Sequence, residues 1–360
     1  MKKIELENKV VLITGVAGFI GANLACKLLN SVEQIRIVGI DNMNDYYDIS
    51  IKEYRLQQIR ITEKSVRGTF EFVKADISCK EVIQVLFSIF RPDIVVNLAA
   101  QAGVRYSVVN PDVYIKSNLE GFYNILEACR HSYDNNTKGV EHLVYASSSS
   151  VYGGCRDVPY SVDEKVDNPV SLYAATKKSN EILAYAYSQL YNIPSTGLRL
   201  FTVYGPAGRP DMAYFGFTEK FLAGKTIQIF NYGKCMRDFT YIDDIIEGIY
   251  RVMKGAPEIQ FQKDGLHVPP YSLYNIGNSQ PVKLLDFVEI LQQELIRAEV
   301  LPVDYDFEMH KEMVDMQPGD VPVTFADIST FERDFNYKPS TTLRTGIRKF
   351  AEWYRDFYQS

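Results

Sequence analysis

Two residues of the chain, Tyr173 and Lys177, have the types and the spacing for acid–base chemistry. They stand four apart near the start of a segment with helical periodicity, so a helix places them on one face. An ammonium close to a phenol favours the phenolate, which can then act as a base near neutral pH. Such a pair is common by chance, so its value as an indication of catalysis depends on the elements that position it.

A run of four serines, Ser147, Ser148, Ser149 and Ser150, follows a predicted strand over residues 142–146. Val151, Tyr152 and Gly153 come next. A serine hydroxyl opposite the tyrosine would share a substrate oxygen and steady it. A plain serine-rich turn is the alternative interpretation of the same residues.

A glycine-rich turn lies near the start of the chain. Gly15, Gly18 and Gly21 have G-x-x-G-x-x-G spacing between an apolar strand at 10–14 and a helix that opens with Phe19 and Ile20. Glycines let the backbone turn sharply and approach a phosphate closely, and helix N–H groups then face the anion. The pattern favours a dinucleotide site, although glycine-rich turns also follow strands for structural reasons alone.

Acidic residues end the next two predicted strands. Asp41 follows a strand at 35–40, about 20 residues past the last glycine, where a carboxylate that binds the adenosine ribose belongs. It would repel a 2′-phosphate, and residues 42–44 contain no Arg or Lys, so NAD is favoured over NADP. Asp76 ends a strand at 70–75, near the expected adenine amino group. A strand-end cap at Asp41 and an ordinary loop residue at Asp76 are the alternatives.

A fourth predicted strand, at 93–97, ends in small residues. Leu98, Ala99 and Ala100 leave room for a cofactor across the sheet edge, and Arg105 could hold an anion or lie in solvent. A long helix is predicted over 111–131 and contains Asn118. Strands alternating with helices predict an α/β fold, a doubly wound parallel sheet of the Rossmann type with right-handed crossovers.

Composition limits the classes of function. The 360 residues are 46% hydrophobic and 23% charged, with net charge −6 and no basic run, so we expect no nucleic-acid partner. No apolar stretch reaches the length of a membrane span, and residues 1–8 are too polar for a signal peptide. Five scattered cysteines indicate reduced thiols in a cytoplasmic protein, and neither they nor the four histidines form a metal-site pattern.

These motifs together resemble the extended short-chain dehydrogenase/reductase family over nearly the whole chain, and within it the UDP-glucuronate 4-epimerases. The resemblance implies that Tyr173 is the catalytic base, that Lys177 lowers its pKa and holds the nicotinamide ribose, and that Ser148 is the catalytic hydroxyl. It implies contacts to NAD from Gly15, Gly18, Phe19, Ile20, Gly21, Asp41, Asn42, Asp76, Ile77, Leu98, Ala99, Ala100, Asn118, Ser147, Tyr173, Lys177, Phe201 and Val203. It implies contacts to a UDP-sugar from Arg105, Ser148, Ser149, Ser150, Tyr173, Thr202, Arg209, Met212, Phe230, Arg237, Gln317 and Asp320.

The resemblance also implies two domains. Residues 1–200 would form the NAD-binding Rossmann domain, with segments at roughly 240–280 returning to it. Residues 201–360 would form mainly a smaller α/β domain that binds the UDP-sugar. Arg237 would pair with the diphosphate, since a guanidinium fork suits phosphate oxygens. The helices at 111–131 and 173–191 would pair with their copies in a homodimer.

The serine run separates this chain from related chemistries. The family's 4,6-dehydratases carry Asp-Glu after the catalytic Thr, and its uronate decarboxylases keep an acidic residue before Val-Tyr-Gly. Here these positions are Ser149 and Ser150, so we expect reversible C4 epimerisation of UDP-glucuronate to UDP-galacturonate through a 4-keto intermediate on tightly bound NAD. The alternatives are a UDP-glucose/UDP-galactose or N-acetylhexosamine 4-epimerase and, more distantly, a non-catalytic NAD-binding regulator.

Overall fold

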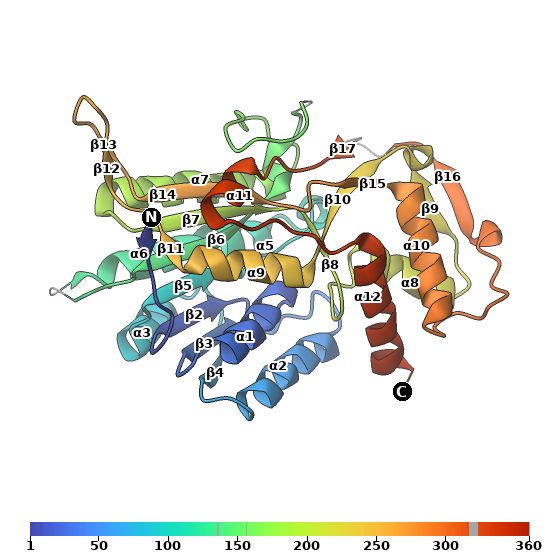
Figure 1. Ribbon diagram of the computed structural model, residues 1–360, viewed down its shortest axis with the longest axis horizontal. Coiled ribbons are helices and arrows are strands. Elements are labelled where there is room, and N and C mark those ends of the chain that lie inside the picture. Colours follow the sequence, from blue (N-terminus) through green and yellow to red (C-terminus); the bar gives the residue numbers. More distant parts are fainter. Residues whose placement is uncertain (135–136, 156, 317–322, 360) are drawn as a thin grey trace. The chain divides into compact units, whose positions relative to one another are not determined.

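The computed structural model describes residues 1–134, 137–155, 157–316 and 323–359 (Figure 1). The chain divides into two compact units. The first comprises Met1–Gly153, Lys165–Leu200 and Ile246–Tyr274, and the second comprises Gly154–Glu164, Phe201–Ile245 and Asn275–Ser360. Each unit is therefore built from segments distant in the sequence.

A seven-stranded sheet forms the centre of the first unit, in the order β14-β7-β6-β5-β2-β3-β4. Neighbours from β7 to β4 pair in parallel. The strands are β2 (Val10–Thr14), β3 (Arg36–Asp41), β4 (Thr69–Lys74), β5 (Ile94–Asn97), β6 (His142–Ser148), β7 (Ser195–Leu200) and β14 (Tyr271–Ile276). The prediction of a doubly wound α/β sheet is confirmed.

Helices cover both faces of this sheet. Helices α3 (Lys80–Phe90), α6 (Gly121–His131) and α7 (Leu172–Tyr191) pack an apolar core on one face, which includes Leu12, Val95 and Leu143. Helix α1 (Phe19–Ser31) covers the other face beside α2 (Ile49–Glu63), and Lys27 of α1 pairs with Glu247 of α9 (Ile242–Met253) at 3.0 Å. Because the strands are parallel, their carboxyl ends meet at one edge, where the predicted motifs gather.

Two elements differ from the sequence-based expectation. Strand β6 extends to Ser148, so the first two serines of the run belong to the strand. The helix predicted over 111–131 is divided into α5 (Asp112–Tyr114), a π-helical stretch (Ile115–Glu120) and α6. Asn118 lies in this π-helical stretch and its side-chain amide hydrogen-bonds to Gln101, a detail that apolar periodicity does not reveal.

The second unit is smaller and contains mixed α/β structure. Strand β10 (Met236–Tyr241) pairs in parallel with β8 (Thr202–Tyr204) and β17 (Val323–Thr324), and antiparallel with β15 (Pro281–Lys283). Strand β9 (Ile227–Phe230) pairs with β16 (Lys311–Val314). The helices are α8 (Ala213–Leu222), α10 (Leu284–Arg297), α11 (Ser329–Phe335) and α12 (Leu343–Tyr358). Aromatic side chains from α8 and α12, among them Phe215, Phe350 and Tyr354, pack its core.

Candidate functional site

The start of α7 is held against the end of β6. The helix begins at Leu172 because the side chain of Ser171 caps it, accepting a hydrogen bond from the N–H of Ala174 at 3.1 Å. One turn on, the buried ammonium of Lys177 donates to the carbonyl of Ala146 at 2.8 Å. Burial lowers the pKa of Lys177 from its ordinary 10.5 to about 8. Tyr173 lies half-buried on the same face of α7, so the pair and the serine-rich strand end come together as predicted.

The serines at the end of β6 have different partners. The hydroxyl of Ser147 donates to Glu181 at 2.6 Å, whereas the hydroxyl of Ser148 accepts from the N–H of Ser150 at 3.1 Å. The Ser148 oxygen is thus held by the turn while its proton can be given to a ligand oxygen. Ser149 and Ser150 lie half-buried in the 3₁₀ turn Ser149–Tyr152.

Sequence reasoning missed a buried ion pair beneath the serines. Glu181 of α7 accepts from Arg199 of β7 at 2.8 and 2.9 Å, and both side chains are almost fully buried. The guanidinium also stacks over the ring of Tyr152, 4.8 Å from its centroid. The position of Glu181, one helical turn beyond Lys177, was the available signal, since it puts the carboxylate on the face of α7 toward the sheet.

The glycine turn is closely packed. Gly15 has φ +70°, and a Cβ there would meet the backbone of Ala99 at 2.8 Å. A Cβ at Gly21 would meet the Gly15 carbonyl at 2.3 Å. Helix α1 begins after Gly18 at Phe19, with Ile20 next, and has no side-chain cap and no acidic residue in its first turn. The backbone N–H groups of this first turn therefore have no side-chain acceptor and suit a pyrophosphate, the group for which the glycine spacing predicts a site.

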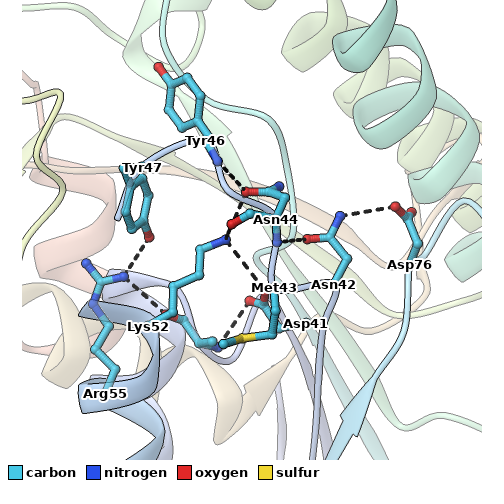
Figure 2. Close-up of polar contacts among 10 residues, drawn as sticks. Asp41, Asn42, Met43, Asn44, Tyr46, Tyr47, Lys52, Arg55 and Asp76 are labelled. Atoms are coloured by element: carbon cyan, nitrogen blue, oxygen red, sulfur yellow. Dashed lines mark hydrogen bonds and ion pairs between the residues drawn. The ribbon is translucent and has the colours of Figure 1, made fainter. Parts of the chain in front are cut away.

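At the adjacent strand end, backbone donors fix the carboxylate of Asp41. Its oxygens accept from the N–H of Ala17 at 3.2 Å and of Met43 at 2.9 Å (Figure 2). The amide of Asn42 donates to Asp76 at 3.1 Å. Burial of Asp76 opposes its ionised form, but hydrogen bonds from Ser78 and Asn42 outweigh that effect and lower its pKa. Asp41, Asn42 and Asp76 thus form one polar edge. The next residue, Ile77, is buried.

Sequence reasoning also missed two cations at this edge. Residues 42–44 contain no Arg or Lys, but cations from further along the chain accompany Asp41. In the structure Lys52 and Arg55 reach the edge from α2, and the Lys52 ammonium lies 3.9 Å from the Asp41 carboxylate (Figure 2). The signal was available, because a crossover helix starts at the carboxyl edge of the sheet and its first turns stay there.

The segment after β5 is bound to the glycine strand. The N–H groups of Leu98 and Ala99 donate to Thr14, and Ala100 lies half-buried beyond them. The side chain of Asn118 is buried, accepts from the N–H of Gln101 at 2.8 Å and donates to the Gln101 carbonyl at 3.0 Å. In the structure Asn118 therefore holds this segment. Arg105 is exposed at the start of α4 (Tyr106–Val109).

The second unit carries the remaining predicted residues. Thr202 of β8 lies beside Phe239, half-buried, between the buried Phe201 and Val203. Arg209 forms a bidentate ion pair with Asp211.

The other predicted substrate contacts lie further along this unit. Arg237 of β10 donates to the carbonyl of Met236 at 2.9 Å. Met212, before α8, and Phe230, which ends β9, are half-buried, and Gln317 and Asp320 lie outside the described residues. Binding by any of these residues stays a prediction.

Two further findings concern the described residues alone. No group of three or more His, Cys, Asp or Glu side chains among them is placed to hold a metal ion. Within the same residues, the helices all lack the length and apolar character needed to cross a membrane.

Comparison with known proteins agrees with this geometry. The model of the NAD dependent epimerase/dehydratase family matches residues 11–276. Protein CapI of Staphylococcus aureus is 46% identical over 97% of this chain and 99% of its own length. UDP-glucuronate 4-epimerase 4 of Arabidopsis thaliana is 44% identical over 97% of this chain and 76% of its length.

Among solved structures, the UDP-glucuronic acid 4-epimerase of Bacillus cereus in complex with UDP-glucuronic acid and NAD superimposes with a TM-score of 0.79. It is 30% identical, and the match covers 97% of this chain and all of that one.

Proposed function

The chain belongs to the NAD dependent epimerase/dehydratase family, and we propose that it interconverts UDP-glucuronate and UDP-galacturonate by reversible epimerisation at C4, with NAD as cofactor. The observation that carries the proposal is the hydrogen bond from Lys177 to Ala146, which holds the Tyr173 face of α7 against the serine-rich end of β6. Likeness to UDP-glucuronate 4-epimerases over 97% of this chain supports the choice of sugar.

When bound, NAD would supply a reversible acceptor for the hydride at C4 of the sugar. Gly15, Gly18 and the open N–H groups at the start of α1 would hold its pyrophosphate, and Asp41 its adenosine ribose. Since each turnover restores the cofactor, tight retention suits this chemistry.

The chain's own groups handle the proton. Tyr173, as phenolate, takes the proton of the sugar 4-hydroxyl and gives it back after the keto sugar has presented its other face. The Lys177 ammonium favours the phenolate by its charge. Ser148 donates its hydroxyl proton to the same sugar oxygen, since its own oxygen is held by Ser150.

The site must also restrain the carboxylate of the sugar acid. A 4-keto uronate is a β-keto acid and loses carbon dioxide when its carboxylate aligns with the carbonyl π system. Ser149 and Ser150 stand where related enzymes carry carboxylates, and they offer uncharged donors instead. With Thr202 and either Arg105 or Arg209, they would hold the carboxylate away from that alignment. Arg237 would pair with the diphosphate, and Met212 and Phe230 would add contacts to the substrate. Gln317 and Asp320 would contact the uridine end.

The test offers UDP-glucuronate and UDP-glucose separately to the purified protein and follows the products by NMR. We expect UDP-galacturonate from the first and little turnover of the second. Turnover of only the neutral sugar would favour a neutral-sugar 4-epimerase, and no turnover of either would favour a non-catalytic NAD-binding role. Stoichiometric release of reduced cofactor would indicate a net dehydrogenase.

We also propose a homodimer in which α6 and α7 pair with their copies. The two helices pack side by side (Figure 1). Helix α7 exposes Ile182 (59%) and Tyr185 (49%), three residues apart on one face, which offers apolar surface to a second copy. Light scattering should give twice the chain mass, and Ile182→Glu should give the single chain mass. A monomeric wild type would contradict this assembly.

A cytoplasmic location is part of the same proposal. All five cysteines lie among the described residues, and none is in a disulfide. Reduced thiols are usual in that compartment.

A further inference from the structure

Two cations of α2, Lys52 and Arg55, are buried beside the polar edge that contains Asp41 (Figure 2). Only 5% of Lys52 and 2% of Arg55 is exposed. Burying a charged side chain is costly unless hydrogen bonds and an opposite charge compensate it. Their partners therefore show what these two side chains are built to hold.

The hydrogen-bond acceptor of Lys52 lies in the segment that follows Asp41, residues 42–48, called here the ribose loop. The ammonium donates to the backbone carbonyl of Asn44 at 2.8 Å and to its side-chain oxygen at 2.9 Å. It also forms the ion pair with Asp41 at 3.9 Å. Burial lowers the pKa of Lys52, and the Asp41 carboxylate works against that shift. A buried charge thus fixes Asn44, which is itself exposed.

Local hydrogen bonds also shape the ribose loop around Asn44. The Asn44 N–H donates to the side chain of Asn42 at 3.1 Å, and the Tyr46 N–H donates to the side chain of Asn44 at 3.4 Å. Met43 has a left-handed φ of +55°, a conformation that a non-glycine residue adopts only when its surroundings impose it. The Lys52 ammonium joins these local bonds to the body of the unit.

Arg55 holds the far end of the same loop. Its guanidinium donates to the Tyr47 hydroxyl at 2.6 Å and to the carbonyl of Ala17 at 3.1 Å. Ala17 lies between Gly15 and Gly18, and its N–H donates to Asp41. Lys52 and Arg55, three residues apart on one face of α2, therefore connect the ribose loop, Asp41 and the glycine turn.

We infer that Lys52 is a positioning residue for cofactor retention: it holds Asp41 and the ribose loop in the conformation that receives the adenosine ribose. The inference rests on the proposed use of NAD. Without Lys52, ordering the loop would fall to the bound cofactor, and affinity would drop by the free energy of that ordering. The catalytic groups around Tyr173 would be unchanged. Removal of Lys52 should therefore weaken NAD binding and leave the catalytic step unaffected.

The experiment compares Lys52→Met with Lys64→Met, which removes the same charge from an exposed position at the end of α2. After the bound nucleotide is removed, NAD and ADP-ribose are titrated calorimetrically into each protein, with no UDP-sugar present. We expect Lys52→Met to weaken both ligands by about tenfold or more, as when a charge-assisted hydrogen bond is lost, and Lys64→Met to match wild type. Turnover at saturating NAD should stay within about threefold of wild type.

Two further variants keep the inference falsifiable. Lys52→Arg, which retains the charge, should recover most of the affinity. Asn44→Ala changes an exposed residue and should weaken NAD by about threefold even if Lys52→Met fails to fold. Equal NAD affinity of Lys52→Met and wild type would overturn the inference, as would a loss of kcat with unchanged affinity. A wild-type chain that binds no NAD would instead refute the proposed function.

Discussion

The ammonium of Lys177 donates to the carbonyl of Ala146 at 2.8 Å, two residues before Ser148 in β6. This contact ties the first turns of α7 to the strand that ends in the serine run. Both residues of the bond lie inside the first unit. One hydrogen bond thereby brings the proposed base, the group that tunes it and the proposed hydroxyl donor to one edge of the sheet.

The buried charge at Lys177 predicts a pH-dependent stability. The pKa of Lys177 is about 8 in the folded state, below its ordinary value of 10.5. Between these two pH values the unfolded chain therefore keeps the proton on Lys177 more readily than the folded chain does. Below about pH 8 the folded state carries the full cost of the buried charge, about 3 kcal/mol, and the cost disappears as the pH rises to about 10.5. The cofactor-free protein should therefore gain stability from this group above pH 8.

Lys177→Met isolates that contribution. Denaturant unfolding of the cofactor-free proteins should show the variant more stable than wild type at pH 7 by about 1–3 kcal/mol, since a hydrogen bond worth about 1 kcal/mol is lost as well. The difference should shrink by pH 10. A difference that is the same at both pH values would contradict the buried-charge account.

Tyr173→Phe should lower turnover by about a thousandfold or more, because it removes the group that takes the proton of the 4-hydroxyl. NAD should stay bound on purification, since the contacts proposed for its pyrophosphate and adenosine ribose at the glycine turn and Asp41 are unchanged. Tyr250→Phe, which removes a hydroxyl from α9, should retain wild-type turnover. Substantial activity in Tyr173→Phe would refute the assignment of the base.

Alanine substitution of the neighbouring Ser147 and Ser148 should have different effects. Ser148→Ala should lower kcat by about tenfold to a hundredfold with little change in unfolding, because its proton is directed to the ligand. Ser147→Ala should lower the free energy of unfolding by about 1–3 kcal/mol, because its hydroxyl donates to the buried Glu181 at 2.6 Å. Steady-state kinetics and denaturant titration of both variants distinguish the two roles, and a reversed pattern would reassign them.

Glu181→Gln should destabilise the protein by about 3–5 kcal/mol. It leaves the buried guanidinium of Arg199 without the carboxylate that accepts at 2.8 and 2.9 Å. Glu53→Gln, at an exposed position of α2, should change stability by less than about 0.5 kcal/mol. Similar unfolding curves for Glu181→Gln and wild type would show that the pair carries no net stability.

Sequence alone located the parts of the site that follow strands. The glycine turn, Asp41 and the serine run stand at carboxyl ends of parallel strands, and the fold brings all such ends to one edge, so period and spacing were enough to predict where they lie. The choice of Ser148 within the run came from the family resemblance. Lys52 and Glu181 were missed because their roles depend on which helix face meets the sheet. The π-helical turn at Asn118 was missed because one extra residue in a turn barely alters an apolar pattern.

The roles of residues in the second unit were predicted from the family resemblance more than from residue type and spacing. Nothing in the type or spacing of Arg209 indicates its two-pronged pair with Asp211, which lies two residues further along an irregular segment. The pairing of Thr202 with Phe239 joins strands far apart in the sequence, and such register is set by the folded unit as a whole.

One measurement tests the proposed chemistry most directly: conversion of UDP-glucuronate that carries deuterium at C4, without added NAD, followed by NMR and mass spectrometry. Transfer to the bound cofactor and back predicts UDP-galacturonate that retains the deuterium at C4 and keeps its carboxylate. Product that has exchanged the label with solvent, has lost carbon dioxide, or appears only when NAD is supplied in stoichiometric amount would contradict the account.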